Sequence, residues 1–190
     1  MADTSRLMRF KRDAVKVVAA NIQAFDNTLA DRHTIISCDD GLRFDIHWSH
    51  WCYMHLCGLK CNIPQAEYRN GRHPKEADWF YRVALAGRLS PRHICCSAGE
   101  RLMKRKTEVF PLLNRLPDLD LTVVETGKQE LYLAIGDERF AVGTLISEKD
   151  SPYIPGEKIL LPRTLRQQDV RRLAAEGTVI RRVVDIEVRP

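Results

Sequence analysis

The chain has 190 residues, of which 44% are hydrophobic and 29% are charged. This balance excludes global disorder, and the length suits one well-packed domain rather than two of full size. The 30 lysines and arginines outnumber the 25 acidic residues, and the net charge of +5 favours an anionic partner such as RNA or DNA.

The cysteine content bears on the compartment. Six cysteines would permit disulfides in a secreted protein, yet the N-terminal stretch MADTSRLMRFKRDAVKVV lacks the apolar core and cleavage site of a signal peptide. No run of residues approaches the roughly 20 apolar residues that a membrane span needs. We therefore expect a cytoplasmic protein with reduced thiols and no membrane partner.

Helices are expected to dominate the first part of the chain. From Lys11 to Asp31, apolar residues recur at steps of three and four, which is typical of an amphipathic helix. The segments HTIISCD and LRFDIHW then alternate around an Asp-Gly pair, which predicts a tight hairpin. Pro74 is expected to open a helix that runs to Leu89, and a longer helix is expected from about Glu100.

Beyond Pro117 the pattern changes to strands. The segments LDLTVVET, ELYLAIG and ERFAVGTLI predict an antiparallel meander, KILLP a fourth strand, TLRQQDVRRLAAEG a capped helix and TVIRRVVDIEV a closing strand. We predict an α+β fold in which N-terminal helices pack on a four- to five-stranded antiparallel β-sheet. The single domain would span residues 1–190, with a core over about 10–170 and a C-terminal helix-strand extension over 166–190.

The stretch DIHWSHWCYMHLCGLKC, Asp45 to Cys61, holds three histidines, three cysteines and two tryptophans. Its thiols and imidazoles could form a tetrahedral zinc site, but the spacing is loose and no second ligand pair follows. We expect these thiols to pack as small apolar core residues, with zinc as the alternative. A thiol hydrolase built on Cys52 and His55 is a second alternative, although no known protease signature surrounds them.

Two questions about this stretch stay open at the level of sequence. Its aromatic residues could serve the core or stack a nucleobase; they are Trp48, Trp51 and Tyr53. His55 could be a packed residue or an acid–base group. An imidazole, cations and hydroxyls are what is needed to cleave RNA without a metal, because a base must take the 2′-OH proton and cations must stabilise the phosphate.

The order of three motifs resembles a known family. YMHLCGL is followed by KTEVFPLL on a helix and by LPRTL at a strand end. This order resembles a phage-associated branch of the barnase, EndoU, colicin and RelE-like (BECR) nucleases over about residues 10–170. The resemblance implies N-terminal helices against a four-stranded antiparallel sheet, in a metal-independent ribonuclease without a cofactor. Such domains are found among toxins of prophages and mobile elements.

The resemblance also implies roles for particular residues. The histidine of the first motif falls on His55, as general base or acid, and the lysine of the basic helix falls on Lys106, as phosphate clamp with help from Arg101. Thr164 or Tyr153 would act as a positioning group. The expected catalytic residues are therefore His55, Lys106, Thr164 and Tyr153, and the expected substrate-binding residues are Arg101, Lys104 and Arg163.

The expected function is a metal-independent endoribonuclease that cleaves RNA by 2′-OH transesterification. Its setting would be a toxin of a phage or mobile element, with an antitoxin or immunity protein as partner. One alternative is an ADP-ribosyltransferase-like enzyme that uses NAD, with Glu125, Glu130 or Glu138 as the catalytic glutamate. The other is a non-catalytic module that binds nucleic acid or protein. The extension after Gln168 would be a family decoration or a partner surface.

Overall fold

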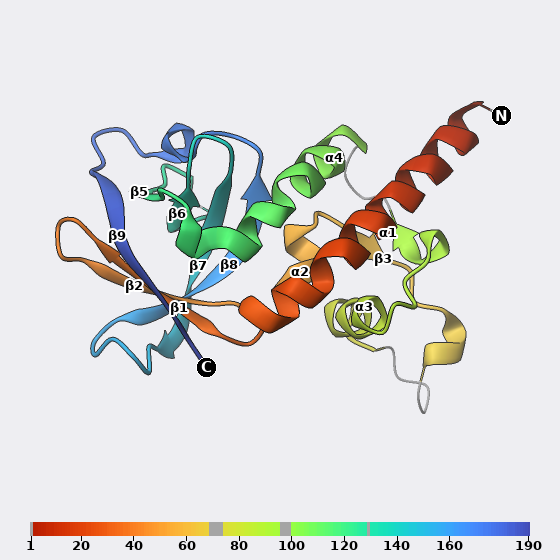
Figure 1. Ribbon diagram of the computed structural model, residues 1–190, viewed down its shortest axis with the longest axis horizontal. Helices are drawn as coiled ribbons and strands as arrows, with labels where there is room; N and C mark the ends of the chain where they lie inside the picture. The colour runs from red at the N-terminus through yellow and green to blue at the C-terminus, as the bar shows by residue number, and fades with distance from the viewer. Residues whose placement is uncertain (1, 69–73, 96–99, 129) are drawn as a thin grey trace.

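The computed structural model of the chain describes residues 2–68, 74–95, 100–128 and 130–190. Figure 1 shows a helical part beside a β-barrel, with the N-terminus at the far end of α1 and the C-terminus at the barrel. The helices are α1 (Ala2–Thr28), α2 (Cys52–Leu56), α3 (Glu76–Leu85) and α4 (Glu100–Val109), and the 3-10 turns are η1 (Gln65–Glu67), η2 (Pro91–His93), η3 (Phe110–Asp118) and η4 (Val170–Leu173). None of the described helices is long and apolar enough to cross a membrane.

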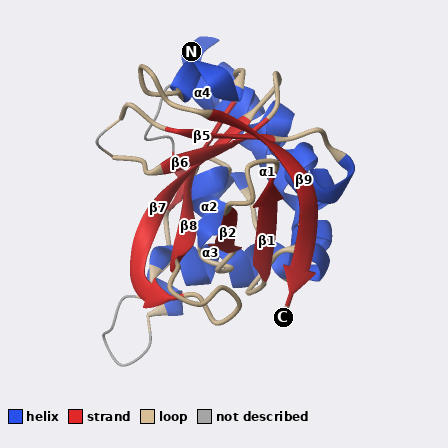
Figure 2. Cartoon of the chain, turned by 90° about the vertical axis from the view of Figure 1, so that its left-hand side faces the viewer, coloured by secondary structure: helices blue, strands red, loops and turns tan. Residues whose placement is uncertain are grey.

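Seven strands of the described residues form a closed barrel in the order β1-β2-β8-β7-β6-β5-β9. They are β1 (His33–Cys38), β2 (Arg43–His47), β5 (Thr122–Glu125), β6 (Leu133–Gly136), β7 (Ala141–Asp150), β8 (Lys158–Arg166) and β9 (Ile180–Arg189), while β3 (Lys60–Cys61) and β4 (Ile94–Cys95) pair separately. Figure 2 shows how β7 and β9 curve along the two sides of the barrel.

The predicted antiparallel sheet of four to five strands is therefore wrong, since seven strands close into a barrel. The hairpin of β1 and β2 joins the meander, because β2 pairs with β8 in parallel through two residue pairs, Asp45 with Ile159 and Ile46 with Leu160. The last strand, β9, pairs with both β1 and β5 and so closes the ring. Alternation of apolar and polar residues predicts strands, but it does not say which strand edges meet.

The helix predicted over TLRQQDVRRLAAEG does not form either. Strand β8 continues to Arg166, and a single 3-10 turn follows, capped by the Asp169 side chain, which accepts a hydrogen bond from the Arg171 backbone N–H. Val170 and Leu173 in this turn are buried in a small core of their own beside β5, β6 and β7. Covering this part of the barrel takes two apolar side chains, so one short turn is enough.

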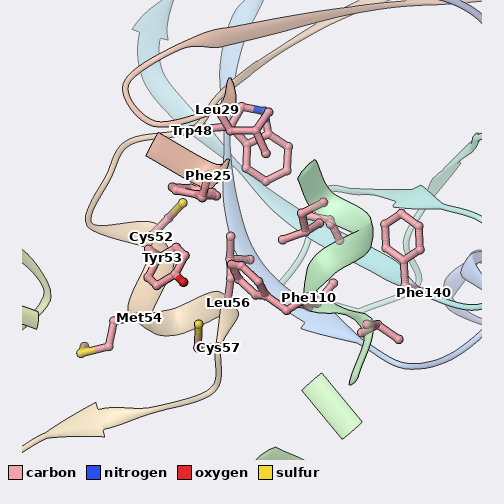
Figure 3. Close-up of a cluster of buried hydrophobic side chains, with 14 of the residues drawn as sticks. Phe25, Leu29, Trp48, Cys52, Tyr53, Met54, Leu56, Cys57, Phe110 and Phe140 are labelled. Atoms are coloured by element: carbon pink, nitrogen blue, oxygen red, sulfur yellow. The ribbon is translucent and has the colours of Figure 1, made fainter. Parts of the chain in front are cut away.

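The predicted amphipathic helix is confirmed as α1, which buries one apolar face against the main core; its buried residues are Phe10, Ala14, Val18, Ile22 and Phe25. The Tyr53 hydroxyl donates a hydrogen bond of 2.9 Å to the Val18 carbonyl. Figure 3 shows Tyr53 beside Phe25 and Phe110, whose ring centroids lie 4.9 and 5.0 Å from its own. This aromatic cluster fixes α2 between α1 and the barrel.

The segment predicted as a C-terminal extension belongs to the barrel. Arg181 on β9 is buried, and its guanidinium donates to Asp40 Oδ2 at 2.7 Å and to Glu125 Oε1 at 3.2 Å. Asp40 lies in the turn between β1 and β2, whereas Glu125 ends β5, so β9 holds the two parts of the barrel together. Its neighbour Val183 packs against the main core.

Two adjacent residues of β9 test this assignment. Val183 points toward the core, and Val184, which is 61% exposed, points to solvent. We expect Val183→Asp to lower the free energy of unfolding by about 2 kcal/mol or more, since it places a carboxylate against apolar side chains. Val184→Asp should change it by less than about 0.5 kcal/mol. Chemical denaturation measures both, and equal effects would contradict the barrel assignment of β9.

Candidate active site

An open pocket of about 890 Å³ lies where α2 and β8 meet the turn between β5 and β6; its lining residues are His55, Lys128, Glu130, Leu131, Leu145, Arg163, Thr164 and Arg166. Lys106 reaches it from α4, because its Nζ donates to Thr164 Oγ1 at 3.5 Å. Both α2 and α4 pack against β8. The structure thus brings together His55, Lys106, and the consecutive residues Arg163 and Thr164, from three distant parts of the sequence.

The His-Leu-Cys-Gly-Leu motif is the end of helix α2. Gly58 has a φ of +69°, and its N–H donates to the His55 carbonyl at 2.9 Å, while the Leu59 N–H donates to the Met54 carbonyl at 3.2 Å. These two bonds form a Schellman motif, in which glycine is favoured because it adopts a positive φ without strain. The motif ends the helix one turn after Met54 and leaves His55 half-buried at the pocket.

Gly58 has a second role in the site. A Cβ atom on this residue would lie 2.5 Å from Cδ and 3.6 Å from Nζ of Lys106. The lysine side chain therefore crosses the glycine at van der Waals distance on its way to Thr164. A residue with any side chain at position 58 would strain the backbone and also displace the ammonium group.

A β-bulge in β8 explains why two consecutive residues face the pocket. Thr164 pairs with Gly143 and Pro162 pairs with Thr144, so Arg163 has no partner across β7. Bulges of this kind turn a side chain out of the usual alternation. Arg163 therefore lines the pocket together with Thr164 and Arg166, which share one face of the strand by ordinary alternation.

Gly143 on β7 leaves space for two side chains that line the pocket, Leu131 and Thr164. A Cβ on Gly143 would lie 2.6 Å from Cδ1 of Leu131 and 3.0 Å from Cγ2 of Thr164. The absent side chain lets Leu131 fill the space beneath the turn and lets the threonine methyl pack inward. With its methyl group held there, Thr164 has its hydroxyl beside Lys106 Nζ.

The surroundings set the charge of the imidazole and of the ammonium group. Burial lowers the pKa of His55, and the nearby cations Arg163, Lys106 and Lys60 lower it further, against an opposing effect of Glu76. Burial also lowers the pKa of Lys106, and Arg166 adds to this. At neutral pH the imidazole is therefore uncharged and able to accept a proton, and Lys106 gives up its proton more readily than an exposed lysine.

Other predicted residues lie elsewhere. The Tyr153 ring packs edge-on against His33 with a centroid distance of 5.1 Å, and its hydroxyl donates to the Pro190 carbonyl oxygen, so the structure does not bring it to the pocket. Lys104 lines a groove between α1 and α4, and Arg101 is exposed on α4. Conversely, Lys128 and Arg166 line the pocket without having been predicted, since one lies in a turn and the other in a segment predicted as helix.

The three glutamates of the ADP-ribosyltransferase alternative lie in different places. Glu130 lines the pocket, Glu125 is paired with Arg181 in the barrel wall, and Glu138 is exposed in the turn after β6. One carboxylate therefore faces the cations of the pocket.

Cys52 and Cys57 lie in the main core, as expected for thiols that pack as small apolar groups. Burial strongly raises the pKa of both thiols, so neither is a thiolate nucleophile at neutral pH. Within the described ranges, no three His, Cys, Asp or Glu side chains are arranged to hold a metal ion. Cys96, another of the six cysteines, lies outside the described residues.

A neutral imidazole beside a group of cations, in an open pocket floored by a rigid barrel, is typical of proteins that bind and cleave phosphate esters. A family profile described as phage-Barnase-EndoU-ColicinE5/D-RelE like nuclease4 matches residues 18–169. The chain belongs to this family and is a nuclease of the BECR type. No curated protein and no solved structure matches it. The three motifs lie within the matched segment, whereas β9 lies beyond it.

The contact of Gly58 with Lys106 can be tested separately from the backbone strain that any side chain would cause at this positive φ. Gly87, with a φ of +67°, ends α3 in the same way but has nothing within 4 Å of its Cβ position. We expect Gly58→Ala and Gly87→Ala each to cost about 1 kcal/mol of stability. Because Gly58→Ala also displaces Lys106, it should lower nuclease activity by about 10- to 100-fold, and Gly87→Ala should not. Nuclease assays with denaturation curves measure both, and equal losses of activity would contradict the role of this contact.

Proposed function

We propose that the chain is a metal-independent endoribonuclease that cleaves RNA by attack of the ribose 2′-OH on the adjacent phosphate. The observation that carries this proposal is the meeting of an uncharged imidazole with Lys106, Arg163 and Thr164 in one pocket. RNA supplies its own nucleophile in this reaction, so the protein needs a base, an acid and cations. Those are the groups that the pocket contains.

His55 acts as the general base. Its neutral imidazole accepts the 2′-OH proton, and the 2′ oxygen attacks phosphorus in line with the departing 5′ oxygen. The products are a 2′,3′-cyclic phosphate and a free 5′-OH end. Because burial and neighbouring cations keep His55 uncharged, the base is ready at neutral pH.

The cations bind the phosphate and supply the proton for the leaving group. Arg163 and Arg166 hold the nonbridging phosphate oxygens, where negative charge grows in the transition state. Lys106 has a lowered pKa, so we assign to it the proton that the 5′ oxygen takes up on leaving. The Thr164 hydroxyl positions this ammonium group through their 3.5 Å contact.

We also propose a biological setting. The description of the family joins nucleases of the colicin and RelE types and marks this branch as phage-associated, which supports a toxin of a phage or mobile element. An enzyme that cleaves RNA in its own cell needs restraint, so an antitoxin or immunity protein is the partner that we propose. RNA is the proposed substrate.

The first test uses a DNA oligonucleotide that carries a single ribonucleotide. In the presence of EDTA, the wild-type protein should cleave after the ribonucleotide and leave a 2′,3′-cyclic phosphate, which mass spectrometry identifies. His55→Ala should lower the rate by about 100-fold or more, because it removes the general base. His47→Ala is the matched control, since His47 is also half-buried with a lowered pKa but stacks on His33.

Cleavage of the all-deoxy oligonucleotide at the same rate would contradict transesterification, and an unchanged rate in His55→Ala would remove His55 from the mechanism. Consumption of NAD without RNA cleavage would favour the ADP-ribosyltransferase alternative, in which Glu130 would be the residue to replace. In growing cells, expression of the wild type should arrest growth and expression of His55→Ala should not.

The dependence of cleavage on pH gives an independent test. The acidic limb of the profile should lie below 6.5, because cleavage requires deprotonated His55 and its pKa is lowered. The alkaline limb should lie below 10.5, because cleavage requires protonated Lys106. Arg163→Ala removes a cation that opposes protonation of His55, so the acidic limb should move to higher pH.

Arg166→Ala should move the alkaline limb to higher pH for the same reason, since Arg166 lowers the pKa of Lys106. Normalised profiles of kcat/KM for the two variants and the wild type measure these shifts. If Arg163→Ala leaves the acidic limb unchanged, that limb does not report His55; if Arg166→Ala leaves the alkaline limb unchanged, that limb does not report Lys106.

A further inference from the structure

Helix α2 exposes few of its side chains. Of the residues from Trp51 to Cys57, all of them described, only Trp51 and His55 are not buried. The Trp51 side chain is 37% exposed, whereas the five others are at most 2% exposed. The solvent face of this helix therefore consists of an indole and the proposed general base.

The indole and the imidazole lie on the same side of α2. Trp51 has the helical φ and ψ of −69° and −16°, and it precedes His55 by four residues. Side chains at this spacing are neighbours on a helix, with Cβ atoms about 5–6 Å apart. Because His55 lines the pocket, Trp51 lies one helical turn from a residue of the pocket wall.

The other two aromatic candidates of this stretch are committed to the core. Trp48 is fully buried and its Nε1 donates to Thr34 Oγ1 at 2.9 Å. Tyr53 is fully buried and donates to the Val18 carbonyl. Figure 3 shows both rings among the core side chains. The choice between core and base stacking, which the sequence left open, is thereby settled for two of the three residues.

We propose that Trp51 is the base-binding platform of the enzyme, on which the nucleobase next to the cleaved phosphate stacks. The described residues that line the pocket supply cations and a carboxylate but no aromatic ring, so they recognise phosphate without holding a base. An exposed indole one helical turn from the base catalyst supplies the missing contact. Stacking on an aromatic face accepts any base, so this platform fits single-stranded RNA of mixed sequence.

This inference rests on the proposed function, but binding tests it separately from cleavage. The probe is a single-stranded 2′-O-methyl RNA tetranucleotide, which has no free 2′-OH and cannot be cleaved. Trp51→Ala should raise its dissociation constant by about 5- to 100-fold, and Trp51→Phe should restore most of the affinity. On cleavable RNA, Trp51→Ala should raise KM more than it lowers kcat.

Tyr132→Ala is the matched control. Tyr132 is 46% exposed and follows Leu131, but unlike Leu131 it is not one of the described residues that line the pocket. Its replacement should leave the dissociation constant unchanged. The wild-type protein gives a second readout without any substitution. Since Trp48 and Trp79 are buried, quenching of tryptophan fluorescence by iodide reports Trp51, and the tetranucleotide should reduce that quenching.

The possible results separate the two proposals. Equal affinity of wild type and Trp51→Ala, or iodide quenching that the tetranucleotide does not change, overturns the platform and leaves the cleavage mechanism standing. Failure of the wild type to bind the probe also overturns the platform. Weaker binding by Trp51→Ala in a protein that cleaves no RNA supports the platform and overturns the proposed function.

Discussion

The contact of Lys106 with Thr164 across Gly58 is the interaction on which the site depends. It joins α4, the end of α2 and strand β8, three elements from distant parts of the chain. The ammonium group is partly buried and lies near the Arg166 guanidinium, and both facts make its charge costly. A bound phosphate would offset that cost, because it places negative charge among the cations. The site is therefore best satisfied when an anion occupies it.

The barrel makes this arrangement rigid. Thr164 and Arg163 belong to β8, which has β7 on one side and β2 on the other, and the bulge turns both side chains to the pocket. Closing the ring requires β9, which lies outside the segment that the family profile matches. The candidate site thus depends on a strand that the shared motifs do not include. Elements built into a closed sheet hold side chains more precisely than loops do.

The sequence named several residues that the structure brings together, but it predicted less of the fold. The periodic helices, the hairpin and the meander were identifiable because apolar spacing reports local structure. The closure of the barrel could not be predicted, because strand periodicity does not encode which edges pair. The parallel pairing of β2 with β8 has no signature in the local sequence. His55, Lys106 and Thr164 came from the order of motifs. Arg166 was missed because a strand end rich in charged residues resembles a helix start.

Packing explains why cysteines and aromatic rings are concentrated around His55. A helix of five residues has little stability of its own, so α2 must be held by packing. Cys52, Tyr53, Leu56 and Cys57 supply this by filling the core beneath it, and small thiols let the helix approach α1 and the barrel closely. The unusual composition first suggested a metal site. It instead anchors a short helix on which the exposed Trp51 and the half-buried His55 lie one turn apart.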